Sequence, residues 1–238
     1  MLELIKKILR FGPFKVAYEP LHKIYRLYSV PHRRRVLRRM GPDVLQDLSA
    51  IFSRHNIQAF AAYGTLLGFV RENGFISHDE DMDFGVVPGT ITPQGLLRIL
   101  LEKEIGFDVK FIFKYQERVV EFKVVYKGIP IDFFFFEDRG EKYVSPLLFY
   151  IPEKKYADPR ANAVREVTFT AVKGLSKTRL FDLVDFPIPQ NAEDVLRSLY
   201  GESWRIPDKK WNDNKRPQIV EMPEPGYQIS LDEAYALN

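Results

Sequence analysis

The most constraining feature of this 238-residue sequence is an acidic run, residues 79–83, that leads directly into an apolar segment. Alternate side chains of a strand share a face, so Asp81 and Asp83 point one way while Met82 and Phe84 point into the core. The two aspartate Cα atoms are then about 6.5 Å apart, a spacing at which carboxylates converge on hard cations. An acidic turn in solvent is the alternative, but the apolar flanks favour a buried strand.

A third carboxylate is expected from a neighbouring strand. Asp132 is the candidate, because it lies within the apolar segment Ile129–Phe136, where an aspartate is costly unless it is paired, protonated or metal-bound. Glu121 and Asp108 are weaker candidates, and a sheet-edge aspartate facing water is the alternative for Asp132. Magnesium prefers one or two carboxylates together with substrate phosphates, so the pattern predicts a magnesium site.

The segment before the acidic run has the features of a phosphate-binding turn. Gly64 and Thr65 follow a short predicted strand and open a helix, so backbone N–H groups and the helix N-terminus face a common point. Arg71 adds a guanidinium fork that suits phosphate oxygens. The Gly-x-x-x-Gly spacing of Gly64 and Gly68 is weak evidence by itself and gains weight only beside the carboxylates.

Hydrophobic periodicity along the chain predicts an α+β fold, a small mixed β-sheet flanked by helices. We expect a basic N-terminal arm over 1–40, a central domain over 41–207 and a Pro-rich C-terminal tail over 208–238. Helices are predicted over 41–56, 93–104 and 191–200, the last capped by Asn191, with a short helix after Ser230 whose Glu233 completes a capping box; strands are predicted over 58–63, 82–87, 107–115, 119–126 and 129–136, the last three as a meander.

Charge is unevenly distributed along the chain. Residues 1–40 carry eleven Lys and Arg against two glutamates, a net of +9, so the rest of the chain carries −6 of the total of +3. This arm is interpreted as a solvated helical face or as a surface for an anionic membrane or phosphorylated substrate; nucleic acid is the weakest partner, because no recognition module accompanies the charge. Three prolines between residues 13 and 31 are expected to break the arm into short pieces.

Composition excludes several classes of protein. The chain has no cysteine, which rules out disulfides, thiolate nucleophiles and Cys-ligated zinc, and its four histidines lack zinc spacing. The longest uncharged central run, residues 57–70, has 14 residues, below the roughly 20 that a membrane-spanning helix needs. Because the N-terminus also lacks the features of a signal peptide, a cytoplasmic location is the default expectation, extended to peripheral contact with the inner face of the membrane through residues 1–40.

Several motifs occur in a specific order along the centre of the chain. They are Gly64-Thr65-Leu66-Leu67-Gly68-x-x-Arg71, Gly74-Phe75-Ile76, Asp79-Glu80-Asp81-Met82-Asp83, Phe186-Pro187-Ile188-Pro189 and Leu199-Tyr200-Gly201-Glu202-Ser203-Trp204-x-x-Pro207. Together they resemble the LicD family, a branch of the nucleotidyltransferase (polymerase-β-like) fold that includes the fukutin-related proteins. The resemblance covers about residues 42–207 and leaves out the N-terminal arm and the C-terminal tail.

The resemblance implies a metal-dependent transfer of phosphocholine, ribitol phosphate or glycerol phosphate from a CDP-activated donor to a glycan or glycolipid acceptor. It implies Mg²⁺ or Mn²⁺, as two ions, and makes residues 41–207 the catalytic domain. By motif match, the catalytic residues and metal ligands are Asp81, Asp83 and Asp132, and the nucleotide- and phosphate-binding residues are Gly64, Thr65, Gly68, Arg71 and Asp79.

The sequence departs from the family pattern just before the acidic run. The family usually has Pro-Trp where this chain has Ser77-His78, and Glu80 replaces a frequent aspartate, which points to a different donor pocket. His78 is either an acceptor-side base or a structural residue. Two rival functions stay open: a nucleotidyltransferase that moves NMP to a small molecule, RNA or protein, and a non-enzymatic membrane- or nucleic-acid-binding protein with a degenerate site.

Overall fold

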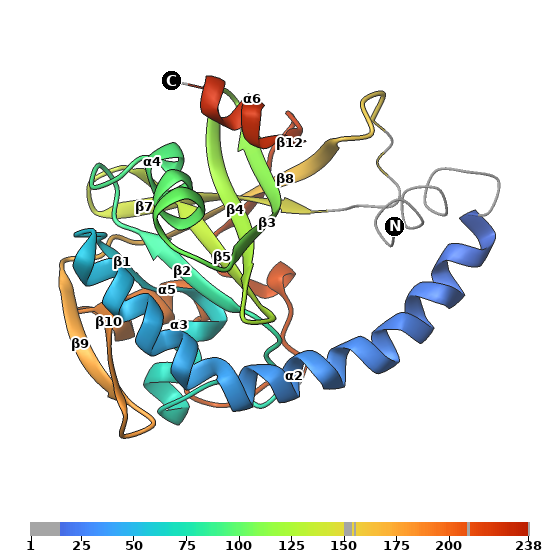
Figure 1. Ribbon diagram of the computed structural model, residues 1–238. Coiled ribbons are helices and arrows are strands. Elements are labelled where there is room, and N and C mark those ends of the chain that lie inside the picture. The colour runs from blue at the N-terminus through green and yellow to red at the C-terminus, as the bar shows by residue number, and fades with distance from the viewer. Residues whose placement is uncertain (1–14, 150–153, 155, 209, 238) are drawn as a thin grey trace.

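The computed structural model describes residues 15–149, 154, 156–208 and 210–237, and Figure 1 shows their arrangement. In these residues the helices are α2 (Lys15–Arg54), α3 (Tyr63–Glu72), α4 (Pro93–Arg98) with a π-helical turn (Ile99–Lys103), α5 (Ala192–Tyr200) and α6 (Leu231–Ala236), and Asp213–Lys215 forms a 3-10 turn. The strands are β1 (Ala59–Ala61), β2 (Met82–Val86), β3 (Phe107–Tyr115), β4 (Arg118–Tyr126), β5 (Ile129–Phe135), β6 (Glu137–Asp138), β7 (Lys142–Phe149), β8 (Ala161–Thr170), β9 (Leu175–Leu180), β10 (Val184–Pro189), β11 (Ile219–Glu221) and β12 (Gly226–Ile229).

Most of the described strands form one curled mixed sheet in the order β1-β2-β5-β4-β3-β12-β8-β7-β6, and β11 pairs with β8. The strands β2 and β5 run parallel, whereas their outer neighbours β1 and β4 run antiparallel to them. The strands β9 and β10 form a separate hairpin. The predicted mixed sheet with surrounding helices is confirmed, but the sheet is larger than expected because β6–β8 and the C-terminal strands extend it.

The predicted meander is confirmed as β3, β4 and β5. The connection between β4 and β5 is a two-residue turn in which Lys127 and Gly128 have φ values of 49° and 80°. Positive φ at both central residues is the geometry of a type I′ turn, whose twist matches that of the flanking strands. This tight turn fixes the register that sets Lys123 of β4 opposite Asp132 of β5.

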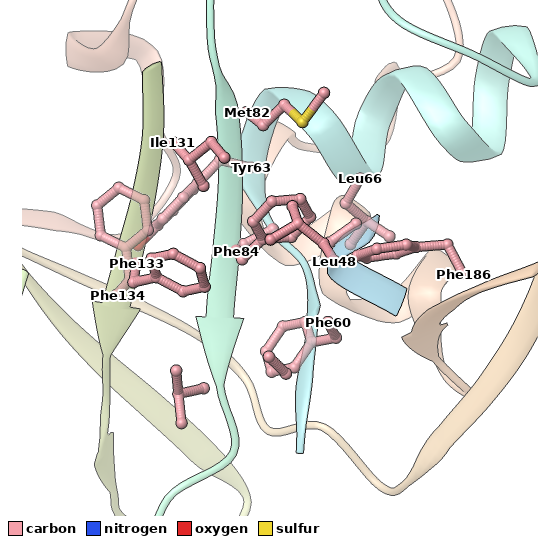
Figure 2. Packing of buried hydrophobic residues seen from close by; sticks show 14 of the residues in the cluster. Leu48, Phe60, Tyr63, Leu66, Met82, Phe84, Ile131, Phe133, Phe134 and Phe186 are labelled. Carbon is pink, nitrogen blue, oxygen red and sulfur yellow. The ribbon is translucent and has the colours of Figure 1, made fainter. Parts of the chain in front are cut away.

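The core between the sheet and α2 is built from aromatic rings. Phe84 of β2 and Phe133 of β5 are register partners, and Phe52 of α2 meets both edge-on, with ring centroids 6.0 and 6.3 Å away. Phe186 of β10 completes the cluster, with its ring centroid 5.2 Å from that of Phe84. Figure 2 shows both rings among the buried residues. As predicted, Met82 and Phe84 therefore point into the core, and the strand alternation turns the intervening aspartate to the opposite face of the sheet.

From Lys15 onward the N-terminal segment is not broken into short pieces, which corrects the sequence-based prediction, whereas residues 1–14 of the expected arm, including Pro13, lie outside the described residues. A single helix, α2, spans Lys15–Arg54. It begins well before Gly41, where the sequence predicted a helix to start. Positions 20, 31 and 42 are prolines spaced by 11 residues, three helical turns, so the missing backbone donors fall on one side. The helix curves smoothly in Figure 1, and its C-terminal half packs on the core. None of the described helices is long and apolar enough to cross a bilayer.

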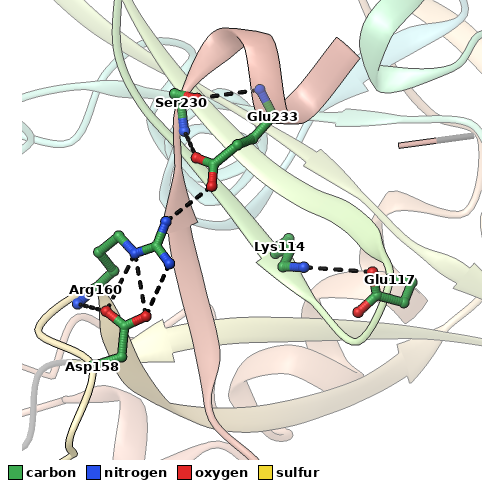
Figure 3. Close-up of polar contacts among 6 residues, drawn as sticks. All are labelled: Lys114, Glu117, Asp158, Arg160, Ser230 and Glu233. Carbon is green, nitrogen blue, oxygen red and sulfur yellow. Dashed lines mark hydrogen bonds and ion pairs between the residues drawn. The ribbon is translucent and has the colours of Figure 1, made fainter. Parts of the chain in front are cut away.

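The segment expected as a Pro-rich tail contributes to the sheet instead. Strand β12 lies between β3 and β8, with Tyr227 opposite Lys114 on one side and Ala161 on the other. The predicted capping box of α6 is confirmed: Ser230 Oγ accepts from the backbone N–H of Glu233 at 3.2 Å, and Glu233 Oε2 accepts from that of Ser230 at 2.7 Å (Figure 3).

Two other helix starts show different caps. Thr92 caps α4, because its Oγ1 accepts from the backbone N–H of Gly95 at 3.1 Å. Asn191 was expected to cap α5, but its side chain makes no capping bond. It accepts from the backbone N–H of Lys173 at 3.0 Å and donates to the carbonyl of Ala171 at 2.9 Å. The competing bonds join α5 to the end of β8.

Candidate active site

A row of charged side chains crosses the face of the sheet opposite the α2 core. Asp83 of β2 is the register partner of Asp132 on β5, which is the partner of Lys123 on β4. The predicted placement of Asp132 on the strand next to Asp83 is therefore confirmed. Lys123 Nζ lies 2.8 Å from Asp132 Oδ2 and 3.3 Å from Asp81 Oδ2. Sequence analysis missed Lys123, although a lysine between apolar residues on the strand that carries Glu121 was a detectable signal.

Burial and mutual repulsion disfavour the charged forms of these carboxylates. Asp132 is 5% exposed, and burial, more than the charge of Asp81, raises its pKa to about 7 against the opposing effect of Lys123. Burial, then Asp81 and Asp132, raises the pKa of Asp83 well above its ordinary value. Burial acts to lower the pKa of Lys123, but the neighbouring carboxylates outweigh it and raise that pKa. A bound cation would relieve this repulsion.

The carboxylates fit a divalent cation as a pair rather than as a ready-made cluster of three. Among the described residues, no three acidic or histidine side chains are gathered closely enough to hold an ion. Lys123 bridges Asp81 and Asp132, yet Asp132 Oδ1 is buried without a hydrogen-bond partner. Two carboxylates completed by ligand phosphates are the usual protein share of a magnesium site, and Asp83 with Asp132 meets it.

The two weaker candidates for the third carboxylate, Glu121 and Asp108, lie in different environments. Glu121, two residues from Lys123 on β4, lies on the same face; it is 8% exposed and lines the cavity described below. Burial, followed by the charge of Asp132, raises its pKa. Asp108 has a side chain that is 68% exposed and pairs with Lys110. Glu121 therefore belongs to the site, and Asp108 does not.

The turn from β1 into α3 brings the backbone close to the carboxylates. Tyr63 has φ of +43°, a left-handed conformation that is strained for a bulky residue. Its hydroxyl donates to Ser145 Oγ at 2.6 Å and its ring meets Phe134 edge-on at 4.8 Å, which hold it in place. A Cβ added to the next residue, Gly64, would lie 3.6 Å from Asp83 Oδ2. Gly64 thus lies at the site, and its contact with phosphate stays a prediction.

Thr65 and Gly68 position the site from within α3. Thr65 is 1% exposed, and its Oγ1 accepts from the backbone N–H of Asp83 at 2.8 Å. A Cβ added to Gly68 would lie 2.5 Å from the carbonyl oxygen of Gly74, so glycine permits a close approach of the following loop. These contacts give both residues a structural task, and the phosphate contacts that the sequence predicts for them stay a prediction.

Arg71 and Asp79 lie on the wall of one cavity. Arg71 Nη2 pairs with Glu72 Oε1 at 2.8 Å, and Nη1 donates to the carbonyl of Trp204 at 3.4 Å. Asp79 Oδ2 is buried without a partner, and burial, followed by the charge of Asp81, raises the pKa of Asp79 to about 7. A cationic fork and an unsatisfied carboxylate therefore both face the ligand space.

Arginines of the basic cluster of α2 form hydrogen bonds and ion pairs with the loop that carries the acidic run. Glu80 of this loop has its expected place in the acidic motif but contacts α2 rather than the cavity. The loop thus has a fixed support from a distant part of the chain. The contacts are Arg33 Nε to Glu80 Oε2 at 2.9 Å, Arg34 Nη2 to Glu80 Oε1 at 3.7 Å, Arg34 Nε to the carbonyl of His78 at 3.1 Å, and Arg38 Nη2 to the carbonyl of Ser77.

The cavity in front of the carboxylates has a volume of about 620 Å³. Asp79, Asp83 and Glu121 line one side, and aromatic residues of the C-terminal segment line the other, with His78 also on the wall. Arg216 is 8% exposed on that second side, among the rings of Tyr63, Tyr200 and Trp211 at 5.1, 5.2 and 5.0 Å from its Cζ. Sequence analysis missed Trp211 and Arg216 because their segment was interpreted as a tail.

Fold and site together define a protein with a carboxylate-lined ligand cavity at the parallel β2–β5 pair. A profile described as the LicD/FKTN/FKRP nucleotidyltransferase domain matches residues 56–191. The chain belongs to this family. It is also similar to the ribitol-5-phosphate transferase FKTN of Mus musculus, with 25% identity over 189 residues, and of Homo sapiens, with 24% over 187. These alignments cover 78% and 77% of this chain but only 38% and 37% of the relatives, so the chain spans less than half of their length.

Proposed function

We propose that this chain is a phosphotransferase that moves a phospho-alcohol group from a nucleotide-activated donor to a hydroxyl of a glycan or glycolipid. The observation that carries the proposal is the register pair of Asp83 and Asp132 beside a 620 Å³ cavity, in a chain of the LicD family. Similarity to ribitol-5-phosphate transferases makes CDP-ribitol the first donor to test, followed by CDP-glycerol and CDP-choline. A nucleotidyltransferase-type fold for the central domain is part of the same proposal.

Phosphoryl transfer in this cavity forms a bond between the acceptor oxygen and the phosphorus of the phospho-alcohol. The bond from that phosphorus to the oxygen of the nucleoside monophosphate breaks, and CMP leaves. A bound magnesium ion would neutralise the developing charge and orient the phosphates. Asp83 and Asp132 would hold it, with Asp81 as the third carboxylate in the prediction; manganese and a second ion belong to the same proposal.

The remaining residues orient groups and move the proton. Asp132 Oδ1, which lacks a hydrogen-bond partner in the described residues, is our candidate to take the proton of the acceptor hydroxyl. Lys123 fixes the opposite oxygen of Asp132 and limits its rotation. Arg71, held by Glu72, presents its guanidinium to the cavity and supports donor phosphates. A role of His78 at the acceptor side remains part of the proposal, since it lines the same wall.

We also propose that α2 contacts an anionic membrane surface. Although Arg33, Arg34 and Arg38 are engaged with the acidic loop, Arg35 and Arg39 are exposed. Leu27 and Tyr28 are 72% and 78% exposed on the same helix. A basic helix with exposed apolar side chains suits an anionic surface that carries a lipid-linked acceptor. Sedimentation with anionic liposomes at low salt tests this, and an active protein that stays in the supernatant would reject it.

The mass of the reaction product tests the enzymatic proposal. Incubation with CDP-ribitol, Mg²⁺ and a glycan acceptor should add a ribitol phosphate mass to the acceptor and release CMP. Asp83→Ala should abolish the reaction, whereas Asp108→Asn, an exposed aspartate outside the cavity, should retain it. Addition of a CMP mass to the acceptor would instead establish the nucleotidyltransferase alternative. Full turnover by Asp83→Ala would contradict the assigned site.

A further inference from the structure

The C-terminal side of the cavity contains two buried N–H donors that have no acceptor within the described part of the chain. They are Nη1 of Arg216 and Nε1 of Trp211, and both residues line the cavity. Buried donors are almost always paired in folded proteins, and an unpaired one is costly. Two of them at one wall point to a ligand that supplies the acceptors.

The ion pair of Arg216 uses only part of the hydrogen-bonding capacity of its guanidinium. Nε and Nη2 both donate to Asp213 Oδ1, at 3.0 and 2.7 Å. The Asp213 side chain is 44% exposed and the Arg216 side chain is 6% exposed, so the carboxylate is the solvated partner and the guanidinium the buried one. The rings of Tyr63, Tyr200 and Trp211 lie around the guanidinium, and its Nη1 is buried without a partner in the described residues.

We propose that Arg216 and Trp211 form an oxyanion subsite that binds a phosphate group of the ligand. A guanidinium edge and a neighbouring indole N–H offer donors to different oxygens of one phosphate, an arrangement that suits planar, charge-assisted recognition. This inference rests on the proposed function only in assigning the cavity to a phosphorylated ligand. Both residues lie outside the segment 56–191 that matches the family.

The charges of the cavity favour a phosphate beside an arginine over one beside the carboxylates. Asp79, Asp83 and Glu121 also line the cavity and repel an anion that has no cation beside it. Arg216 is the buried cation of the C-terminal segment, and with Arg71 it is one of two arginines on the cavity wall that can hold a phosphate when metal is removed. The subsite is therefore observable in EDTA, apart from any magnesium-dependent contact.

Intrinsic fluorescence reports on this cavity directly. The chain has two tryptophans, Trp204 and Trp211, and both line it. Titrations in EDTA would use pyrophosphate, CMP and glycerol 3-phosphate, with cytidine and glycerol as unphosphorylated counterparts, and calorimetry as a second readout. The variants are Arg216→Gln and Trp211→Phe, which keeps an aromatic ring but removes the indole N–H. The control is Arg179→Gln, a 56% exposed arginine on β9.

The phosphorylated probes should bind wild type and the control more tightly than their counterparts. Arg216→Gln should weaken them about 10-fold or more and Trp211→Phe by a smaller factor, because charge-assisted bonds are about twice as strong as neutral ones. If Arg216→Gln unfolds, Trp211→Phe decides the test. Preference for CMP would assign the subsite to the donor, and preference for glycerol 3-phosphate to an acceptor phosphate.

Three results would overturn the subsite. These are cytidine or glycerol binding as tightly as the phosphorylated probes, wild-type affinity in both variants, or no phosphate-dependent binding by wild type. The outcome is separable from the proposed function. Asp83→Ala that loses turnover but keeps metal-free phosphate binding supports both, whereas normal phosphate binding by a wild type without transferase activity overturns the function alone.

Discussion

The two sides of the cavity differ in how the chain builds them. The carboxylate side comes from adjacent strands, where Asp83 and Asp132 are register partners and the alternation of one strand sets the direction of its side chains. The C-terminal side comes from α5 and the segment after it, where Arg216 reaches Tyr63 across 153 positions of sequence. A regular strand makes its site readable from a local pattern, whereas a site made by distant segments has no such pattern.

The largest expected effect follows from removing the carboxylate pair. Asp83→Ala and Asp132→Asn should each lower turnover by at least about 10²- to 10³-fold, the scale of losing one electrostatic group of an active site. Asp83→Ala should not unfold the protein, because removing this carboxylate relieves the repulsion of the others. Asp132→Asn also breaks the pair with Lys123, so it should lower stability while the protein stays folded. Turnover and thermal unfolding measured on the same preparations check both parts, and a loss of activity explained by unfolding would weaken the assignment.

Lys123→Met should lower both stability and activity, because Asp132 and Asp81 then lose their cationic partner. Breaking a buried charge pair costs about 3 kcal/mol. Urea unfolding measures the change in free energy, and Lys110→Met, whose pair with Asp108 is exposed, is the control with an expected change below about 1 kcal/mol. Adding Asp132→Asn to Lys123→Met should restore part of the stability; no restoration would mean that the lysine acts elsewhere.

Thr65 distinguishes a positioning residue from a phosphate contact. Thr65→Val should cost about 1–3 kcal/mol of unfolding free energy, since the backbone N–H of Asp83 loses its acceptor. Thr65→Ser, which keeps the hydroxyl, should rescue most of it. Comparing unfolding with the KM for the donor separates the two roles. A raised KM with unchanged stability in Thr65→Val would instead support the phosphate contact that the sequence predicts.

The ion pair between α2 and the acidic loop should contribute less to the free energy of unfolding. Arg33→Gln and Glu80→Gln should each cost about 0.2–1 kcal/mol, with a coupling energy of the same size in the double mutant, because the pair is partly exposed. A double-mutant cycle at two salt concentrations measures the coupling, which should shrink at high salt. Additive effects of the two substitutions would show that the contact contributes nothing in solution.

The smallest expected effect concerns Glu104, which does not line the cavity and changes only the pH dependence of stability. Hydrogen bonds and charge from His55 and Arg54 lower the pKa of Glu104. A carboxyl whose pKa is lower in the folded state stabilises the protein above its unfolded pKa, about 4.3, and this stability is lost as pH falls through the folded value. Glu104→Gln should therefore flatten the acid limb of stability against pH. An unchanged limb in urea titrations would contradict the pairing.

Short sequence patterns predicted much of the fold and the carboxylate side of the site. The meander of β3–β5, the inward side chains of β2, the capping box of Ser230 and the neighbourhood of Asp83 and Asp132 all followed from alternation and short motifs. These features depend on residues close in sequence or on strands joined by tight turns. Their physics is therefore contained in short windows of sequence.

The features that were missed depend on tertiary contacts. The prolines predicted a broken arm, but packing of one half of α2 and arginine contacts to the 77–80 loop support a continuous helix. Lys123 was overlooked because its partners are on another strand and a loop. Arg216 was overlooked because the Pro-rich composition of its segment hid strand β12 and a buried guanidinium.

The most direct test of the account is thermal stabilisation by CDP-ribitol with and without Mg²⁺, measured on wild type, Asp83→Ala and Asp108→Asn. A ligand at 100 times its Kd adds about 2.7 kcal/mol to folding stability, which is readily measured. The account predicts a magnesium-dependent shift in wild type and Asp108→Asn that is lost in Asp83→Ala. An equal shift in all three proteins, or none with any cytidine nucleotide, would contradict the claim that the Asp83–Asp132 pair is the centre of a phosphotransferase site.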